Sequence, residues 1–458
     1  MATTAATADA VHFDQVFLAE GWARDTRIIV REGLIAAIES GVPPQPGDES
    51  AAIGLPGIAN LHSHAFQRGM AGMAEVAGPE GDSFWTWREL MYRFVGRLDP
   101  DSLCAIAALA YAEMLESGFT RVGEFHYLHH AANGAPYSDP AGMTHAIVAA
   151  VEESGIALTH LPVFYAQGGF GGAAPTPAQR RFVTDVDQFA RILEGARAAT
   201  AGLPDAVVGV APHSLRAVTK PQLEAVAALA AGTPIHIHIA EQTREVEDCL
   251  AWSGQRPVEW LLDHAAVDSS WCLVHATHVT EAEVAAIARC RAVVGLCPIT
   301  EANLGDGLFP VARFRARDGA FGIGSDSNVL IDMCEELRWL EYGQRLTARA
   351  RNIVGGEPGR STGAALFKAA LAGGAQALGV PGGLAVGLPA DMIALDARHP
   401  SLGGREGDAL LDSLVFAAGR SAIDTVWRRG RAVVRGGRHV DRERIAARYR
   451  RTLEALLA

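Results

Sequence analysis

Two histidines one residue apart, His62 and His64, end an apolar run in the segment GIANLHSHAFQRG at residues 57–69. Side chains at positions i and i+2 of a β-strand point to the same side, so both imidazoles face one point in space. A third histidine, His238, and an aspartate, Asp326, lie at the ends of two later apolar runs. Three imidazoles and a carboxylate suit zinc or ferrous iron when a water takes the open coordination position. The spacing therefore predicts a site for one metal ion.

The run PIHIHIAE places two histidines, His236 and His238, on one face of a predicted strand. Both compete for the role of third metal ligand. We choose His238 because Glu241 then follows three residues later, just past the strand end, where its carboxylate can reach a metal-bound water. His236 is then a structural histidine, or one that supports a ligand from behind.

These residue types together predict hydrolysis at a carbon–nitrogen bond. A metal ion lowers the pKa of its bound water from ~15.7 toward ~7, which makes hydroxide available at neutral pH. Glu241 can then carry a proton to the leaving nitrogen, and Asp326 can accept one from the attacking water. His275, at the end of another apolar run, can stabilise the tetrahedral centre. Removal of ammonia from a C=N carbon is the reaction that this set predicts.

Eight apolar runs at fairly regular intervals predict the strands that position these residues. They read LPGIANLH, FTRVGEFHY, IALTHLPVFY, VVGVAPHS, PIHIHIAE, SWCLVHATHV, AVVGLCP and FGIGSDS. Helix-like segments such as DPDSLCAIAALAYAEMLESG separate many of them. Apolar strands that alternate with helices predict a parallel sheet, and eight such units predict an α/β fold, a closed TIM-like (β/α)8 metal-dependent hydrolase barrel. The polar side chains would then meet at the C-terminal ends of the strands.

The two ends of the chain do not follow the period of the barrel. Residues 11–55 alternate between apolar and polar types, and residues from about 384 read as short strands with turns. We expect both ends to form one small β-sandwich beside the barrel. The predicted domains are therefore residues 1–55 and 384–458, which are the two parts of the sandwich, and residues 56–383, which form the catalytic barrel.

Lysine is nearly absent from the sequence. Of its 40 basic residues only Lys220 and Lys368 are lysines, and neither lies on a predicted strand. Many binuclear hydrolases on this architecture bridge their two metals with a carbamylated lysine on a barrel strand. The site should therefore be mononuclear, and Schiff-base chemistry on a strand lysine is not expected.

Composition limits the partners and the compartment. The net charge of −12 and the lack of a basic block argue against nucleic acid or an anionic membrane as a partner. The first ten residues do not read as a signal peptide, and no apolar run reaches membrane-spanning length. Six scattered cysteines without a CxxC pair suit a reducing compartment. We therefore expect a cytoplasmic protein that acts on a small molecule.

The motifs HSH, HIHIAE, LVHATH and GSDS resemble those of the amidohydrolase superfamily, specifically its mononuclear deaminase and chlorohydrolase branch, over essentially the whole chain. HAFQRG, FWTWREL, GEFHYLHH, PHSLRAV and CPITEANLGDG resemble the formimidoylglutamate deiminase family. That family converts N-formimino-L-glutamate to N-formyl-L-glutamate and ammonia in histidine degradation. Relatives that act on purines or triazines usually carry a pattern like HNPxSN after the seventh strand, a place that here holds Cys297, Pro298, Thr300, Glu301 and Asn303.

This resemblance implies a ligand set, a substrate and an assembly. It implies one Zn²⁺ per subunit, with Fe²⁺ also compatible, bound by His62, His64, His238 and Asp326. It implies that the substrate, a small dicarboxylate, is bound by Gln67, Arg88, Tyr127, His213 and Arg216. It also suggests a homodimer.

The two arginines differ in how far the sequence alone supports them. Arg216 lies just beyond the fourth predicted strand, and an arginine fork can hold a carboxylate by two hydrogen bonds. Arg88 lies in FWTWREL, where aromatic packing could fix a loop over the barrel mouth, although a solvated arginine at a helix start explains it as well. Gln67 and Tyr127 are neutral donors that would each usually be structural.

Two other functions fit parts of the sequence. The chain could be a purine, nucleoside or triazine aminohydrolase of the same superfamily, but a pocket for those substrates would be flatter, more aromatic and without paired arginines. It could also be a catalytically silent scaffold barrel. The complete ligand set together with Glu241 and His275 argues against a scaffold, which need not keep a reactive acid beside an open metal position.

Overall fold

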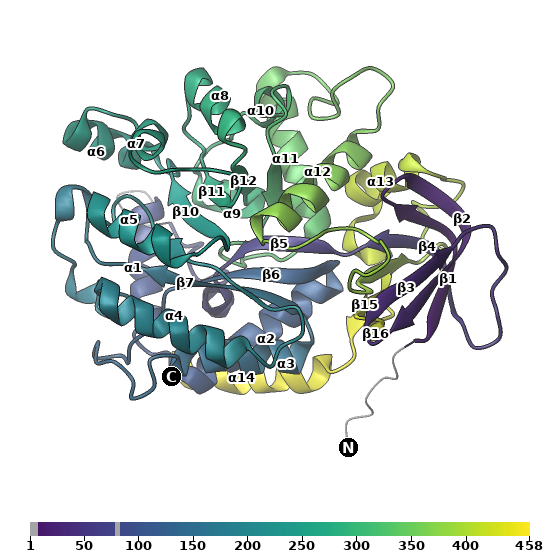
Figure 1. The fold of residues 1–458 in the computed structure, drawn as a ribbon, viewed down its shortest axis with the longest axis horizontal. Coiled ribbons are helices and arrows are strands. Elements are labelled where there is room, and N and C mark those ends of the chain that lie inside the picture. The colour runs from purple at the N-terminus through teal and green to yellow at the C-terminus, as the bar shows by residue number, and fades with distance from the viewer. Residues whose placement is uncertain (1–7, 78–82) are drawn as a thin grey trace.

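The computed structural model describes residues 8–77 and 83–458. Figure 1 shows two regions, a body in which helices surround central strands and a separate sheet on one side that contains the first strands of the chain. No helix in the described ranges is long and apolar enough to cross a membrane.

The central strands form two parallel sheets. One has the order β5-β6-β7-β8 with β9 also paired to β7, and the other has the order β10-β11-β12-β13. The bounds are β5 Ile58–Ser63, β6 Phe119–His126, β7 Ala157–Phe164, β8 Val207–Val208, β9 Ala211–Pro212, β10 Ile235–Ile239, β11 Trp271–His275, β12 Val293–Leu296 and β13 Phe321–Ile323. These are the eight predicted runs in their predicted order, with the fourth divided into β8 and β9. Nearly all of their residues are buried, as expected for parallel strands covered on both faces.

Isolated parallel bridges link the two sheets at both of their junctions. Val210 and Ser214 bridge to Ile235 and His238, and Ser63 bridges to Asp326. The ends of β5 and β13 therefore lie side by side, although more than 250 residues separate them in the sequence.

Helices follow the central strands. Their bounds are α1 Phe84–Val95, α2 Pro100–Glu116, α3 Gly142–Ser154, α4 Val186–Thr200, α5 Lys220–Leu229, α6 Thr243–Ser253, α7 Pro257–His264, α8 Glu281–Cys290, α9 Pro298–Leu304, α10 Val311–Arg315, α11 Met333–Ala348, α12 Thr362–Ala377, α13 Asp408–Ser413 and α14 Arg442–Leu457. Helix α2 begins at the start of the predicted segment DPDSLCAIAALAYAEMLESG. The side chain of Asp99 caps it by accepting a hydrogen bond from the N–H of Ser102 at 2.8 Å. For FWTWREL the sequence left a loop and a helix start open; the structure gives the helix start, because α1 begins at Phe84 and the Ser83 hydroxyl caps its first turn.

Both chain ends join in one eight-stranded sheet, in the order β17-β16-β15-β14-β4-β1-β2-β3. The bounds are β1 Ala10–Leu18, β2 Gly21–Arg31, β3 Leu34–Glu39, β4 Glu49–Pro56, β14 Met392–Leu395, β15 Ile423–Arg428, β16 Arg431–Arg435 and β17 Arg438–His439. β4 pairs with β14, so the N-terminal and C-terminal strands share one set of backbone hydrogen bonds. The two chain ends therefore form one sheet, as expected. The two layers of a sandwich and the limits of the domains stay predictions.

The C-terminal segment adds a helix to the strands that the sequence indicated. Helix α14 returns from the terminal sheet and packs along α2 (Figure 1). Arg442 at its start pairs with Glu113 at 2.9 Å and with Glu116 at 3.3 Å, both on α2.

A buried ion cluster joins the terminal sheet to the central strands. Arg428 on β15 pairs with Asp391 and, at 3.3 Å, with Asp205, and Arg121 on β6 pairs with the same Asp205 at 3.3 Å. The side chain of Arg428 is only 6% exposed. Because the charges are out of water, each depends on its partners.

We predict that Arg428→Ala lowers the free energy of unfolding by roughly 3–5 kcal/mol, since it leaves two carboxylates without their shared cation. The midpoint of urea denaturation measures this change. The control is Arg398→Ala, which removes a guanidinium that is 89% exposed and pairs with Asp396 at the surface, and which should leave the midpoint unchanged. An Arg428 variant as stable as the unmodified protein would contradict the prediction.

Candidate metal and catalytic centre

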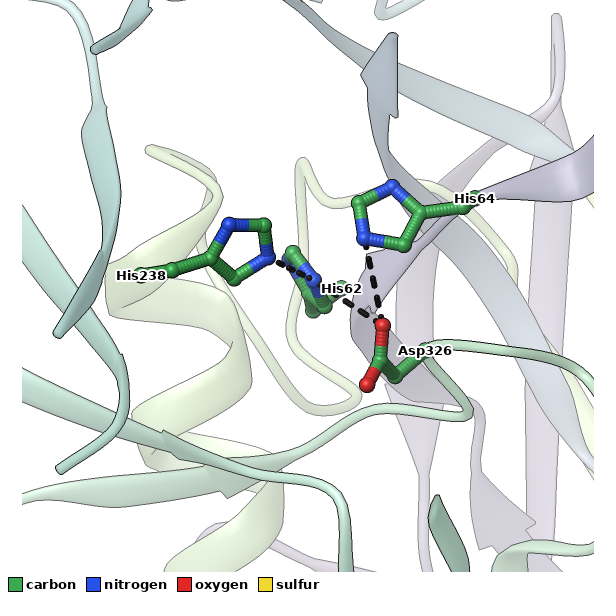
Figure 2. Close-up of side chains that lie close together, drawn as sticks. All are labelled: His62, His64, His238 and Asp326. Carbon is green, nitrogen blue, oxygen red and sulfur yellow. Dashed lines mark hydrogen bonds and ion pairs between the residues drawn. The ribbon is translucent and has the colours of Figure 1, made fainter. Parts of the chain in front are cut away.

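Four predicted ligands converge at the ends of three central strands. Figure 2 shows His62 from β5, His64 directly after β5, His238 from β10 and Asp326 after β13 pointing toward one another. Asp326 Oδ1 lies 3.4 Å from His62 Nε2 and 3.2 Å from His64 Nε2, and the Nε2 atoms of His238 and His62 are 3.0 Å apart. All four side chains are buried, and one ligand atom from each lies within 4.8 Å of the others.

The opposite nitrogens of two rings show which atoms are available to a metal ion. His64 Nδ1 lies 2.9 Å from the carbonyl oxygen of Phe125, and His238 Nδ1 lies 3.1 Å from that of His213. A carbonyl oxygen only accepts, so each Nδ1 carries the proton and each Nε2 keeps its lone pair. Burial lowers the pKa of His62 to about 3, which leaves this imidazole neutral as well. Three neutral imidazoles and a carboxylate around one point fit a divalent cation.

The backbone turns sharply where it presents these side chains. Ala240, His275 and Asp326, which end or closely follow β10, β11 and β13, have φ values of 51°, 68° and 43°. Such left-handed residues are unfavourable unless neighbouring structure holds them, and they are common at functional sites. The strain therefore lies at the ends of the strands that carry the candidate centre.

A glycine permits the close approach of β13 to β5. A Cβ atom at Gly324 would lie 2.7 Å from the carbonyl oxygen of His62, which is closer than a side chain can come. Without that atom the two segments exchange hydrogen bonds, from the N–H of Asp326 to the carbonyl of His62 and from the N–H of His64 to the carbonyl of Asp326, each 3.0 Å long. These bonds fix the aspartate beside the two histidines.

Two groups that can exchange protons, His275 and Glu241, lie beside the ligand cluster, next to its member Asp326. His275 Nε2 is 3.7 Å from Glu241 Oε1 and 3.7 Å from Asp326 Oδ2. Burial raises the pKa of Glu241 to about 6, even though the nearby His275 and Arg216 lower it. Burial lowers the pKa of His275, but the surrounding carboxylates outweigh it and raise the pKa to about 10. The centre thus holds a carboxyl group that titrates near neutral pH and an imidazolium that can donate a hydrogen bond.

A single pocket brings the predicted binding residues to this centre. Its empty volume is about 600 Å³, including space open to solvent, and all the predicted site residues except His62 line it. His62 is fully buried beneath. The remaining wall is mostly aromatic and apolar and was not predicted, namely Phe84, Trp87, Met91, Tyr92, Tyr165, Phe182 and Leu304.

Both predicted arginines reach the pocket, and one tryptophan orients them. The guanidinium carbons of Arg88 and Arg216 lie 4.5 Å and 5.9 Å from the ring centre of Trp85, and that of Arg244 lies 4.9 Å from it. Arg216 is also held by Glu245 at 4.0 Å. Among the described residues the buried Nε of Arg216 has no hydrogen-bond partner, so one donor remains for a ligand.

The neutral members of the predicted set form a second wall. Gln67 Nε2 donates to the hydroxyl of Tyr127 at 2.9 Å, and the buried Oε1 of Gln67 has no hydrogen-bond partner in the part of the chain that the structure describes. His213 Nδ1 lies 3.1 Å from the hydroxyl of Ser214. Burial and the nearby Arg216 hold the pKa of His213 well below its usual range, so this ring is neutral.

The sequence leaves His236, Glu124 and His126 in supporting roles, and the structure buries all three outside the group of four converging ligands. His236 Nε2 donates to the carbonyl of Ala377 at 2.7 Å, and burial lowers its pKa to about 4. Glu124 Oε1 accepts the N–H of Ala65 at 2.8 Å, directly after His64. The choice of His238 over His236 therefore agrees with the geometry. Sequence reasoning did not assign Trp85 or Glu245, although FWTWREL indicated an aromatic cluster beside Arg88.

We predict that His238→Asn lowers the bound divalent metal to well under one equivalent, because it removes one of four converging donors. Metal analysis of the purified protein by mass spectrometry measures this content. His236→Asn is the matched control, since it changes a histidine two residues earlier on the same strand, and it should retain the metal. Equal metal content in both variants would contradict the choice of His238, provided that circular dichroism shows both to be folded.

Comparison with known proteins now gives the family. Residues 53–433 match the amidohydrolase family, and residues 8–52 match the N-terminal domain of formimidoylglutamate deiminase HutF. The formimidoylglutamate deiminase of Pseudomonas aeruginosa is 51% identical over 453 residues, which are 98% of this chain and 99% of that protein. The 5-methylthioadenosine/S-adenosylhomocysteine deaminase of Pelotomaculum thermopropionicum is 28% identical over 449 residues, 93% of each chain.

Solved structures agree with these matches. A crystal structure of an amidohydrolase from Brucella melitensis superposes with a TM-score of 0.95 at 52% identity, over 98% of this chain and 100% of that one. A zinc-bound adenosine deaminase from Xanthomonas campestris shares the fold, with a TM-score of 0.80 at 23% identity over 98% of both chains. The chain therefore belongs to the amidohydrolase family and, within it, to the formimidoylglutamate deiminases.

Proposed function

We propose that the protein hydrolyses N-formimino-L-glutamate to N-formyl-L-glutamate and ammonia, as a step of L-histidine degradation, with one Zn²⁺ per subunit. The pair of guanidiniums beside the candidate centre is the observation that carries this proposal. The 51% identical deiminase of P. aeruginosa supports it across nearly the whole chain.

The substrate matches the pocket in charge and size. It has two carboxylates on one side of the formimino group, and Arg88 and Arg216 are two cations on one side of the ligand cluster. Trp85 holds both guanidiniums, and Glu245 also holds that of Arg216, so little side-chain freedom is lost when they bind an anion. Gln67, Tyr127 and His213 provide neutral hydrogen-bonding groups between the arginines and the cluster.

His62, His64, His238 and Asp326 are the residues that would hold the metal, and Fe²⁺ is the alternative to Zn²⁺ for this ligand set. When bound, such an ion supplies a Lewis acid and makes water a better nucleophile at neutral pH.

The protein's own groups account for the proton transfers. Water adds to the formimino carbon, the bond from that carbon to the terminal nitrogen breaks, and both protons of the water end on the departing ammonia. Asp326 lines the pocket, and its Oδ2, 3.7 Å from His275 Nε2, accepts one proton. Glu241, with a pKa of about 6, transfers protons to the departing nitrogen. His275 donates from Nε2 to the oxygen that develops negative charge.

The same proposal covers the assembly and its surroundings. The two parallel sheets would close into one (β/α)8 barrel, which the bridges at both junctions support, and the terminal sheet would fold into the small sandwich. The chain would act as a cytoplasmic homodimer on a small dicarboxylate, without nucleic acid or membrane as a partner. The acidic composition supports the last part.

We predict that the purified, zinc-loaded protein releases ammonia from N-formimino-L-glutamate and at least 10-fold more slowly from N-formimino-glycine, which lacks the side-chain carboxylate. A coupled ammonia assay measures both rates, with adenosine and guanine as further substrates. Turnover of a purine without turnover of the dicarboxylate would replace the substrate and keep the metal chemistry. No turnover of any of them would favour a scaffold.

A matched pair of variants tests the anion anchor in the same assay. Arg216→Met should lower kcat/KM for the dicarboxylate by about 10- to 100-fold, the value of one or two hydrogen bonds to a charged group. Arg244→Met removes a guanidinium that stacks on the same Trp85 but is not among the described residues that line the pocket, so it should change kcat/KM by less than 3-fold.

We predict that Glu241→Gln lowers kcat by at least roughly 10²-fold, in line with the usual contribution of a general acid or base, while metal content stays at one equivalent. Steady-state kinetics and metal analysis are made on the same preparation. An active Glu241→Gln enzyme would show that another group carries the proton.

A further inference from the structure

His275 is held in an unfavourable backbone conformation at the end of β11. Its φ is 68°, the following residue Ala276 has a φ of 47°, and its side chain is almost fully buried. A bulky residue keeps such a conformation only when its surroundings fix it. The ring stacks on that of His238 at 5.7 Å, but ring stacking alone does not set which nitrogen faces the pocket.

A carboxylate behind the ring does select the nitrogen. Glu301 Oε1 lies 3.2 Å from His275 Nδ1 and also accepts the N–H of Cys297 at 2.9 Å. Glu301 is a buried residue of α9, so bulk water does not compete for this contact. Among the described residues this is the hydrogen bond that the structure gives the His275 ring, since Glu241 and Asp326 lie 3.7 Å from its other nitrogen.

We propose that Glu301 is a positioning residue that holds the Nδ1–H of His275 and thereby aims Nε2 of the ring at the reacting centre. A carboxylate oxygen accepts, so Nδ1 is the donor and the ring cannot turn over without breaking this bond. Mutation of a residue that orients a functional imidazole from behind typically lowers activity by about 10-fold to 100-fold, although the residue never touches the substrate. The kinetic part of this inference rests on the proposed function.

A purely structural role is the rival explanation, and the same helix offers a control for it. Glu301 accepts the N–H of Cys297 at the start of α9, and Glu336 on α11 accepts the N–H of Ile299 in the first turn of that helix at 3.0 Å. Both glutamates are buried and both satisfy backbone donors of one helix end. Of these two glutamates, Glu301 alone contacts His275. Variants of the two residues therefore distinguish an effect on the helix from an effect on the His275 ring.

The experiment compares Glu301→Ala, Glu301→Gln and Glu336→Gln with the unmodified enzyme. Glu301→Ala should lower kcat about 100-fold, change KM by less than 3-fold and keep one equivalent of metal. Glu301→Gln keeps an oxygen that can accept both hydrogen bonds, so it should recover at least 5-fold of the lost kcat. Glu336→Gln keeps the helix contact and should leave kcat within 2-fold.

A nuclear magnetic resonance measurement tests the contact without turnover. In protein labelled with ¹⁵N-histidine, a slowly exchanging Nδ1–H signal of His275, identified by its loss in His275→Gln, should disappear in Glu301→Ala and persist in Glu336→Gln. If the unmodified enzyme does not turn over the dicarboxylate, the proposed function fails while this signal still decides the role of Glu301.

Three results would overturn the inference. They are a Glu301→Ala enzyme whose kcat stays within 3-fold, an equal loss of kcat in Glu336→Gln, and an Nδ1–H signal that survives Glu301→Ala. If Glu301→Ala does not fold, Glu301→Gln carries the test, because its kcat must fall between 2-fold and 20-fold and its Nδ1–H signal must move.

Discussion

The candidate centre depends on holding four electron-pair donors together where they would otherwise repel one another. Lone pairs on His62, His64 and His238 and a carboxylate of Asp326 face a common point in a buried place. Side chains alone do not hold such an arrangement, because each could rotate away. Here the opposite ring nitrogens of His64 and His238 donate to backbone carbonyls, and the backbone of Asp326 exchanges two hydrogen bonds with the strand that carries His62 and the residue after it. The left-handed strand ends and the glycine beside them are the means by which the fold keeps this geometry.

Charge is arranged in layers around that point. Carboxylates of Glu241, Asp326 and Glu301 surround His275, while two arginines, on α1 and after β9, line the same pocket. Buried opposite charges stabilise each other only when their distance and orientation suit an ion pair. An arginine free to move would pair with the carboxylates around His275. Contact with the Trp85 ring holds both guanidiniums in place. The carboxylates around His275 thus remain available for proton transfer and the arginines for binding an anion.

The strands and the ligand cluster could be predicted from the sequence because each rests on a local pattern. Alternation places His62 and His64 on one face, and the parallel order of strands places Asp326 beside them. The place of Arg216 after the fourth strand supported the binding role that the resemblance implied. Trp85, Glu245 and Glu301 could not be found in this way, because their contacts with Arg216 and His275 join residues that are distant in the sequence. The sequence could not decide between a loop and a helix start at FWTWREL because aromatic residues weaken the helical pattern, although the capping serine was a signal for the helix. The roles of the individual site residues, the closure of the barrel and the second layer of the terminal sheet stay predictions.

The pairing of β4 with β14 has a consequence for how the chain is made. The N-terminal strands leave the ribosome first, yet the partner of β4 is completed only after the entire central region, and α14 is the last element of all. Until then the β4 edge presents unpaired backbone groups, which in other proteins attract foreign strands. Pairing across so large a separation in sequence also slows folding, because a long loop must close before the contact forms. A chain that stops before β14 therefore leaves the β4 edge of the first sheet open.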